Sequence, residues 1–191
     1  MVFEEGTTTL NELSELLRNN YDGKETLHQY IINKIDKFGN AVEKVDALAK
    51  EVAEFFAEEL TAYTNGWGHP FRARVAGASS YVDNMELFTA SADGRSEGDY
   101  TSHNSSPQIG YDKVGPTGII NSVTRIDTSK FAGGFILDLK FSKDVFSTQE
   151  NKDKFKNLLK GYKNLGGLQL QINVVDTELL RDAKKHPEKH K

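Results

Sequence analysis

The sequence contains no cysteine, which excludes disulfides, thiolate metal ligands and a cysteine nucleophile within its 191 residues. No apolar run approaches the roughly 20 residues that a membrane-spanning helix needs. The first five residues, Met1 to Glu5, lack both a basic stretch and an apolar stretch, so we expect no secretory signal. Positive charge is not in excess, since the net charge is −4, which argues against a dedicated nucleic-acid binder. We therefore expect a cytoplasmic protein with no nucleic-acid or membrane partner.

Helical signals dominate residues 1–65, in a chain long enough for one domain with a sizeable core. Thr9 and Glu12 have the spacing of a capping box at the start of a short helix. A second short helix is predicted from about Lys24 to Asn33. Between Val42 and Leu60, apolar residues recur at steps of three and four, which predicts a long helix. We interpret its apolar stripe as packing against the core rather than as a partner-binding surface.

Residues 66–118 are rich in glycine, serine, aspartate and proline, so only short elements fit between the turns. A stretch this long and irregular is usually functional or disordered. We predict an ordered loop region because it carries a set of large apolar side chains that could pack it down: Tyr81, Met85, Leu87, Phe88, Tyr100, Ile109 and Tyr111.

Residues 119–191 predict a parallel α/β unit, in which strands alternate with helices. A helix begins at Gly115-Pro116-Thr117, with proline at the first helical position. Two strands, a helix between them and a terminal helix capped by Asp176 follow at 135–141, 168–175, 155–162 and 176–185. The helix start at Gly115-Pro116 could receive an anion, although capping is the simpler interpretation.

The histidines give little sign of a catalytic or metal site. His186 and His190 are four residues apart, the helical spacing of a metal-ligand pair, but Pro187 lies between them and no third ligand is near. We expect no metal site. His28, His69 and His103 have no serine or aspartate partner close in sequence, so a hydrolase that uses His69 or His103 is only a remote alternative.

Two further segments could be structural or functional. Ala92-Asp93-Gly94-Arg95 predicts a tight turn, with anchoring of a carboxylate or a neighbouring loop by Arg95 as the alternative. The small residues at 76–80 would let a backbone or a substrate approach closely.

Three stretches, taken in order, resemble the C-terminal part of the pyruvate formate-lyase family of glycyl radical enzymes. They are Ala92 to Arg95, Ser106 to Val123 with its Gly-Pro-Thr-Gly segment, and Gly166 to Asp176 continuing to His186-Pro187-Glu188-Lys189. The likeness extends loosely over the helices before Asn65.

The resemblance implies a segment of a ten-stranded α/β barrel: a helical part at 1–65, a loop-rich part at 66–118 and a βαβα unit at 119–191. It also implies a homodimeric enzyme when intact, which acts on a small-molecule substrate. Its partner would be an activating enzyme with an iron–sulfur cluster and S-adenosylmethionine, which installs a glycyl radical that oxidises a cysteine. The reaction would be radical cleavage of a C–C, C–O or C–N bond, as in dehydratases, lyases, decarboxylases or formate acetyltransferase.

Both radical residues of the family are expected outside this chain. The chain has no cysteine, and the family motif Arg-Val-x-Gly-Tyr would come after Pro187-Glu188-Lys189, so we expect the glycine radical domain to be missing and the chain to be inactive by itself. Arg74-Val75-Ala76-Gly77 looks like that motif but precedes the other stretches, so we interpret Gly77 as a turn or pocket-wall residue. By position, Ser79 and Ser80 are candidates for the substrate pocket. The alternative function is a non-catalytic module that docks on a separate radical subunit.

Overall fold

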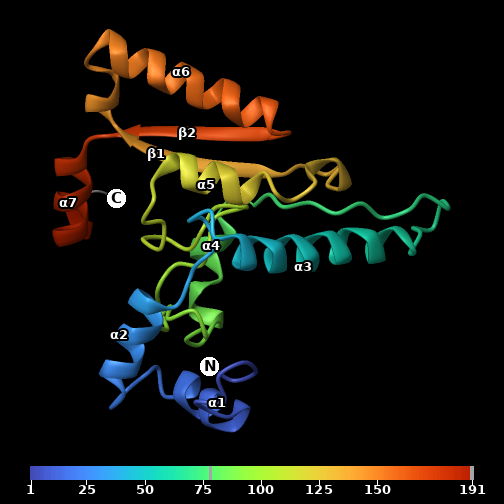
Figure 1. Cartoon of the computed structure of the whole chain (residues 1–191), viewed down its shortest axis with the longest axis vertical. Helices are drawn as coiled ribbons and strands as arrows, with labels where there is room; N and C mark the ends of the chain where they lie inside the picture. Colours follow the sequence, from blue (N-terminus) through green and yellow to red (C-terminus); the bar gives the residue numbers. More distant parts are fainter. Residues whose placement is uncertain (78, 190–191) are drawn as a thin grey trace.

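The fold is a mixed arrangement of helices around a small parallel sheet, seen in a computed structural model that describes residues 1–77 and 79–189 (Figure 1). In chain order the main elements are α1 (Leu10–Arg18), α2 (Glu25–Lys34), α3 (Glu43–Thr61), α4 (Ser80–Asp83), α5 (Pro116–Val123), β1 (Ile136–Ser142), α6 (Gln149–Asn164), β2 (Gln169–Val175) and α7 (Thr177–Lys185). Short 3-10 turns lie at η1 (Met85–Leu87), η2 (Thr128–Lys130), η3 (Lys143–Phe146) and η4 (Pro187–Lys189). Within these described ranges, no helix is both long and apolar enough to cross a membrane.

The capping box predicted for the first helix is confirmed. The Thr9 hydroxyl accepts a hydrogen bond from the Glu12 amide at 3.2 Å, and the Glu12 carboxylate accepts one from the Thr9 amide at 2.8 Å. Each side chain thereby satisfies an amide that the first turn of the helix leaves free. Helices α1 and α2 surround a small core of their own, centred on Tyr21, Ile31 and Ala90.

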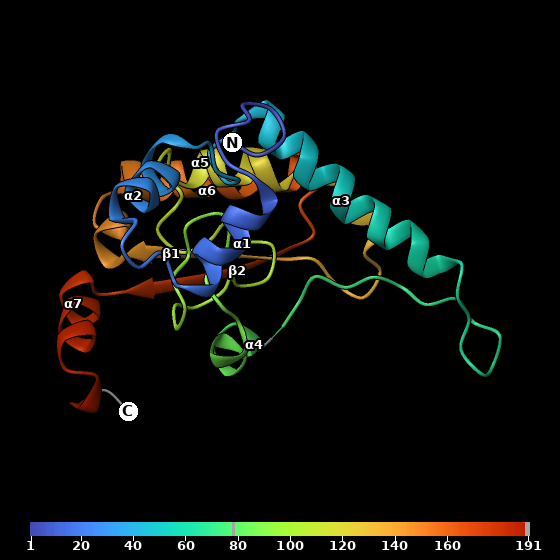
Figure 2. The same cartoon turned by 90° about the horizontal axis from the view of Figure 1, so that it is seen from below.

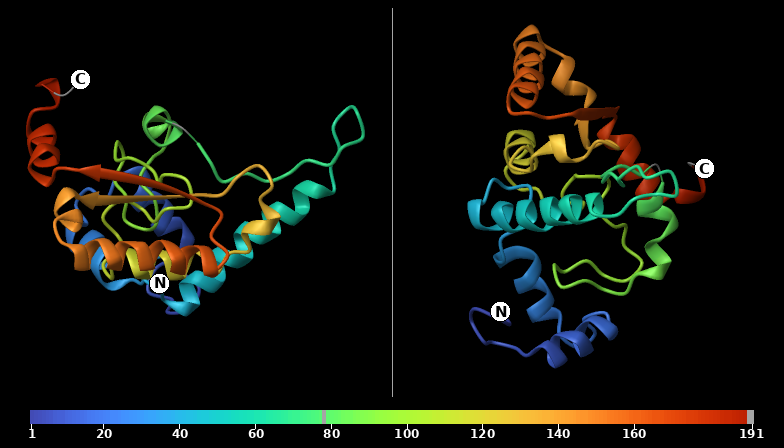
Figure 3. Two further views of the ribbon diagram at one scale, coloured as in Figure 1. Left: turned by 90° about the horizontal axis from the view of Figure 1, so that it is seen from above. Right: turned by 90° about the vertical axis from the view of Figure 1, so that its right-hand side faces the viewer.

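Helix α3 is present as predicted, but the large residues in the middle of its apolar stripe do not face the core. Ala57 is fully buried, and Ala53 and Leu60 pack partly buried against the main core. The large apolar residues on the other side of the helix are exposed: Leu48, Val52, Phe55 and Phe56. The interpretation of this stripe as core packing is therefore confirmed for Leu60 and wrong for the four exposed residues, because the helix is apolar on two faces and only the face with Ala53, Ala57 and Leu60 meets the core. Figure 3 shows the second half of α3 projecting from the rest of the molecule.

The sheet consists of β1 and β2, paired in parallel with Leu137 opposite Leu170 and Leu139 opposite Ile172. Figure 2 shows α5 and α6 on the same face of this pair. Leu137 and Leu139 are buried in the main core, whose other members include Ile120, Val123 and Phe131. The predicted strands and the two following helices are confirmed, with α6 longer than expected. Among the described residues, β2 has no partner on its outer edge.

The other edge of β1 is extended by residues from distant parts of the chain. Val75 forms a parallel bridge with Phe135, in which the Val75 amide donates to the Gly134 carbonyl at 2.8 Å and the Ile136 amide donates to the Val75 carbonyl at 3.1 Å. Further along the same edge, the Ser105 amide donates to the Ile136 carbonyl at 3.0 Å. The loop-rich region is thus attached to the start of β1.

The loop-rich region is held mainly by polar contacts rather than by the apolar side chains expected to pack it down. Leu87, Phe88, Tyr100 and Ile109 are exposed. The expectation of apolar packing is therefore wrong for these four residues, because they lie in short segments with no adjoining layer to cover them.

Arg95 shows how such a polar contact works. The turn before it is confirmed, since the Gly94 amide donates to the Ser91 carbonyl at 2.9 Å and Gly94 has a φ of 102°. The guanidinium is buried and donates to the carbonyls of Ser96 at 2.9 Å, of Asp99 at 3.0 Å and of Thr89. Arg95 therefore anchors the neighbouring loop through backbone oxygens, and no carboxylate within residues 1–77 and 79–189 forms an ion pair with it.

Candidate functional site

A cavity with a volume of about 670 Å³ lies against β1. Its wall combines the loop at 106–112, the first residues of α5, the second half of β1 and one side of α6. Phe141 of β1 and Phe155 and Leu158 of α6 give the wall an apolar part, and the wall also includes Tyr81, His103 and Asp138. An apolar concave wall with a few polar groups is the usual form of a small-molecule site.

The cavity wall contains a histidine–aspartate pair. The Nδ1 atom of His103 lies 3.5 Å from Oδ2 of Asp138, and Asn104 donates to the same oxygen at 2.5 Å. The second carboxylate oxygen of Asp138, Oδ1, is buried with no hydrogen-bond partner among the described residues. The His103 ring packs on Tyr81 with 4.1 Å between ring centroids. A carboxylate at one ring nitrogen fixes the orientation of an imidazole and leaves Nε2 for other partners.

Backbone contacts hold this pair in place. The Asp138 amide donates to the Ser106 hydroxyl at 3.0 Å, and the Ser106 hydroxyl donates to the Asp138 carbonyl at 3.2 Å. Asn104 has a φ of 54° and accepts a hydrogen bond from the Gly77 amide at 2.6 Å. The Ser106 hydroxyl is therefore engaged by the backbone of β1, and the pair is not completed by a serine nucleophile.

The sequence did not indicate this pair, because His103 and Asp138 are far apart in the chain and meet only when the 103–106 segment docks on β1. Local spacing carries no signal for such a contact. The only hint was the position of Asp138 inside an otherwise apolar strand pattern, where a buried carboxylate requires a partner.

The pocket candidates Ser79 and Ser80 lie beside this cavity but do not line it. Both are exposed at the start of α4, and the Ser79 hydroxyl donates to the carboxylate of Asp83. Their neighbour Tyr81 lines the cavity instead. A role for the two serines in the substrate pocket remains a prediction.

The backbone of Gly77 is not in the left-handed region, so a turn that needs a positive φ does not explain why glycine occupies this position. A Cβ atom at Gly77 would lie 2.4 Å from Oγ of Ser80, which is too close for a side chain without movement of the serine. The close approach predicted for the small residues at 76–80 is therefore observed at Gly77, and Ala78 lies outside the described residues.

The remaining histidines occupy separate places. His28 Nε2 lies 2.7 Å from the Gly94 carbonyl, and its ring stacks on Tyr21 with a 4.0 Å centroid distance. His69 sits exposed in the turn after α3. His186 Nδ1 lies 3.6 Å from Glu188, and His190 falls outside the described residues. Across residues 1–77 and 79–189, no three metal-ligating side chains gather.

The helix start beside the cavity has no side-chain cap. Gly115 is the N-cap of α5 with a φ of 83°, and Pro116 follows at the predicted first position. The first hydrogen bond of the helix runs from the Ile119 amide to the Gly115 carbonyl at 3.2 Å. Pro116 and Thr117 form part of the cavity wall.

Two family profiles match the chain. The family described as pyruvate formate lyase-like matches residues 1–84, and the family described as glycine radical matches residues 101–191. The chain belongs to the pyruvate formate-lyase family of glycyl radical enzymes. No Arg-Val-x-Gly-Tyr sequence occurs within the residues that the glycine radical family matches.

Individual glycyl radical enzymes resemble the chain over its full length. A probable dehydratase of Escherichia coli, YbiW, is 32% identical over 100% of this chain and 25% of its own length. The glycerol-bound B12-independent glycerol dehydratase of Clostridium butyricum has a TM-score of 0.89 and 32% identity, over 98% of this chain and 24% of that one. The hydroxyproline dehydratase of Clostridioides difficile has a TM-score of 0.91 and 29% identity, over 100% of this chain and 24% of that one. The chain spans about a quarter of the length of the relatives it matches.

Proposed function

We propose that this chain forms part of a glycyl radical enzyme that cleaves a C–O, C–C or C–N bond of a small metabolite, with dehydration as the leading reaction. The observation that carries the proposal is the match over the whole chain to dehydratases at 29–32% identity, with TM-scores of 0.89 and 0.91. In this proposal the chain contributes a segment of the α/β barrel.

The radical chemistry would come from residues outside this chain. A glycyl radical stores an unpaired electron that is delocalised over the flanking amides, and a cysteine thiyl radical attacks the substrate. With no cysteine, this chain cannot supply the thiyl radical, and we propose that it is inactive by itself. Its partners would be an activating enzyme with an iron–sulfur cluster and S-adenosylmethionine, and a second copy of the intact enzyme. The cytoplasm is the proposed compartment.

The source locus tests this proposal directly. Reading the DNA on both sides of the frame should reveal a cysteine loop upstream and an Arg-Val-x-Gly-Tyr motif downstream, in the same frame or in an adjacent gene. The intact enzyme, activated anaerobically, should then show a glycyl doublet by EPR spectroscopy. The absence of both sequence elements from the locus would refute the enzyme proposal.

Gly77 and the two pocket serines can be tested in the same system. Gly77→Ala should leave the EPR doublet in place, and a doublet lost with that substitution would identify Gly77 as the radical site. Ser79→Val and Ser80→Val in the intact enzyme should impair turnover, whereas unchanged kinetics would remove both residues from the substrate pocket.

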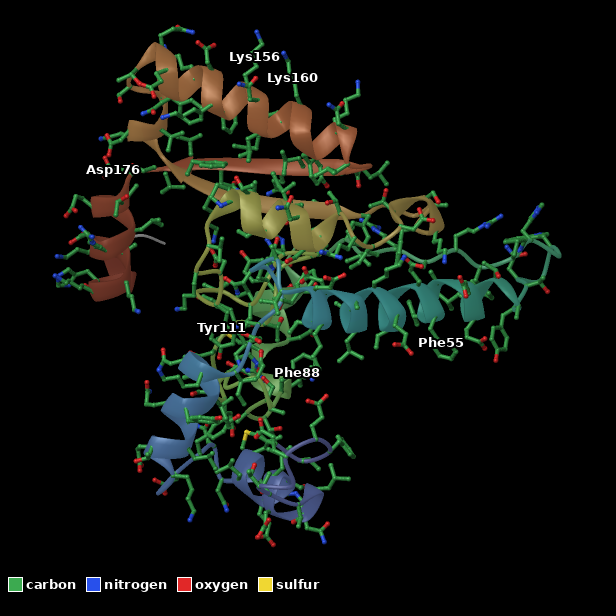
Figure 4. The ribbon with its side chains drawn as sticks, viewed as in Figure 1. Phe55, Phe88, Tyr111, Lys156, Lys160 and Asp176 are labelled. Carbon is green, nitrogen blue, oxygen red and sulfur yellow. The ribbon has the colours of Figure 1, made fainter. Side chains whose placement is uncertain are left out.

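The second candidate function, a non-catalytic module that docks on a separate radical subunit, is favoured by the exposed side of α3. Figure 4 shows Phe55 directed away from the rest of the molecule. Leu48, Val52 and Phe56 are more than half exposed on the same helix, at 61%, 61% and 53%. A helix that is apolar on two sides usually has neighbours on both. A docking module should be monodisperse and unfold cooperatively, whereas an isolated barrel segment should aggregate or bind hydrophobic dyes.

A further inference from the structure

Glycine follows an aspartate or an asparagine at three places in the sequence: Asp22-Gly23, Asn65-Gly66 and Asp93-Gly94. In such a pair the backbone nitrogen of the glycine can attack the side-chain carbonyl carbon of the preceding residue and close a succinimide ring. Glycine favours this attack because it has no Cβ atom in the way and a freely adjustable backbone. Asparagine reacts more readily than aspartate, because its neutral amide resists a nucleophile less than a charged carboxylate does. The three pairs differ in whether the glycine nitrogen is free.

The glycine nitrogen is occupied in both aspartate pairs and free in the asparagine pair. The Gly23 amide donates to Oε1 of Glu25 at 3.1 Å, and the Gly94 amide donates to the Ser91 carbonyl at 2.9 Å. Such a hydrogen bond must break before the nitrogen can attack. The Gly66 amide is exposed and has no hydrogen-bond partner within residues 1–77 and 79–189. The nucleophile is therefore available at Asn65-Gly66.

The side-chain carbonyl of Asn65 is also prepared for the attack. Its oxygen, Oδ1, accepts hydrogen bonds from the Trp67 amide at 3.0 Å and from the His69 amide at 3.1 Å. Two backbone donors on one carbonyl oxygen stabilise the negative charge that develops there when a nucleophile adds, as in an oxyanion hole. The turn is closed by the Asn65 amide, which donates to the His69 carbonyl at 2.9 Å. Figure 3 shows this turn, which follows α3, at the tip of the projecting part of the molecule.

We propose that Asn65-Gly66 is a self-modification site, at which the chain converts Asn65 through a succinimide to aspartate or isoaspartate. The Gly66 nitrogen gives its proton to a solvent base and adds to Cγ of Asn65, so that an N–C bond forms and negative charge moves to Oδ1. The bond from Cγ to Nδ2 then breaks, and Nδ2 takes up a proton and leaves as ammonia. Water opens the ring at either carbonyl, and the overall change is asparagine plus water to aspartate or isoaspartate plus ammonia.

The modification changes both the charge and the shape of this tip. Either product adds a negative charge beside Trp67, whose side chain is 86% exposed. Isoaspartate also adds a methylene to the main chain, because the backbone then runs through the former side chain. The turn lies between Thr64 and Pro70, which form an antiparallel bridge, so a longer main chain would disturb the pairing of its two arms. The main core is far along the chain from this turn and would keep its packing.

The test is incubation of the whole chain at neutral pH in water labelled with heavy oxygen, followed by peptide mapping with mass spectrometry. Ring opening by this water places the label at position 65, and an isoaspartyl methyltransferase detects the isoaspartate. A synthetic peptide of residues 64–70 is the reference, because a short isolated turn of this kind is barely stable in water. We expect Asn65 to react several-fold faster in the folded chain than in the peptide. An equal or slower reaction in the chain would overturn the proposal.

Two variants separate the local geometry from the reactivity of the dipeptide. Asp22→Asn creates a second asparagine–glycine pair in the same molecule, also exposed, whose glycine amide donates to Glu25. Position 22 should then be labelled several-fold more slowly than Asn65, and equal labelling would contradict the proposal. Gly66→Ala tests the nucleophile, since a Cβ atom there meets no heavy atom within 4 Å and Gly66 has no positive φ, so the turn should be kept. The added methyl group should slow labelling of Asn65 several-fold, and an unchanged rate would show that this nitrogen is not the attacking group.

Discussion

Replacing Leu137 with alanine should destabilise the chain strongly, because this side chain occupies the centre of the main core. Leu137 is fully buried in β1, opposite Leu170 of β2. Leucine-to-alanine changes at such sites cost about 2–5 kcal/mol, the sum of lost apolar burial and the cavity left behind. Two parallel strands with helices on one face have few ways to collapse around the gap, so we expect a loss of about 3 kcal/mol in the free energy of unfolding.

Urea unfolding followed by circular dichroism measures this loss, and a thermal scan should show a melting temperature lower by about 6–12 °C for a chain of this size. Leu168→Ala is the matched control, since Leu168 immediately precedes β2 and is 53% exposed. Exposed substitutions of this kind usually change stability by about 0.5 kcal/mol or less. If the two variants lost equal stability, the position of the core described for β1 would be refuted.

Three further outcomes follow from buried polar groups. Burial raises the pKa of Asp46, and the Ser122 hydroxyl and the Arg125 guanidinium oppose this only in part. The folded state therefore holds the Asp46 proton more tightly than the unfolded state does. The free energy of unfolding should then fall as pH rises above the ordinary aspartate range. Asp46→Asn should make it depend less on pH in urea titrations at several pH values. Arg95→Met should speed proteolysis near residues 89–99 several-fold, because it frees three backbone carbonyls, and an unchanged cleavage rate would show that the guanidinium does not hold the loop. Tyr162→Phe removes the hydroxyl that donates to the Gln169 carbonyl at 2.9 Å and should cost about 1–2 kcal/mol in the same unfolding assay, with no effect expected if water replaces it.

The sequence predicts those elements of the fold whose signals are local. The capping box at Thr9 and Glu12, the proline at the start of α5 and the Asp176 cap of α7 each involve residues within a few positions of one another. The Asp176 carboxylate accepts a hydrogen bond from the Glu178 amide at 2.9 Å, as expected for a cap. The division of the chain at residues 65 and 118 stays a prediction.

The contacts that form the candidate site depend on parts of the chain that lie far apart. The His103–Asp138 pair exists because the 103–106 segment follows Val75 along the edge of β1. The spacing of residues in the sequence does not predict this contact. The prediction that the apolar stripe of α3 packs against the core was wrong in part for a related reason. A period of 3.6 shows that a helix has an apolar side, but it does not show which side meets the core when two sides are apolar. Ala53 and Ala57 gave the weaker apolar signal and yet lie on the side that packs.

The open outer edge of β2 has a consequence for how the chain must be handled. Gln169–Val175 is a seven-residue strand without a charged side chain, glycine or proline, and its outer backbone groups have no strand partner within the described parts of the chain. Such a segment has the composition of a template for cross-β stacking, in which identical strands add to one another in register. Pairing of such strands from different chains would compete with native assembly at high protein concentration, and Gln171→Lys would place a charge on the exposed face of the strand that opposes it.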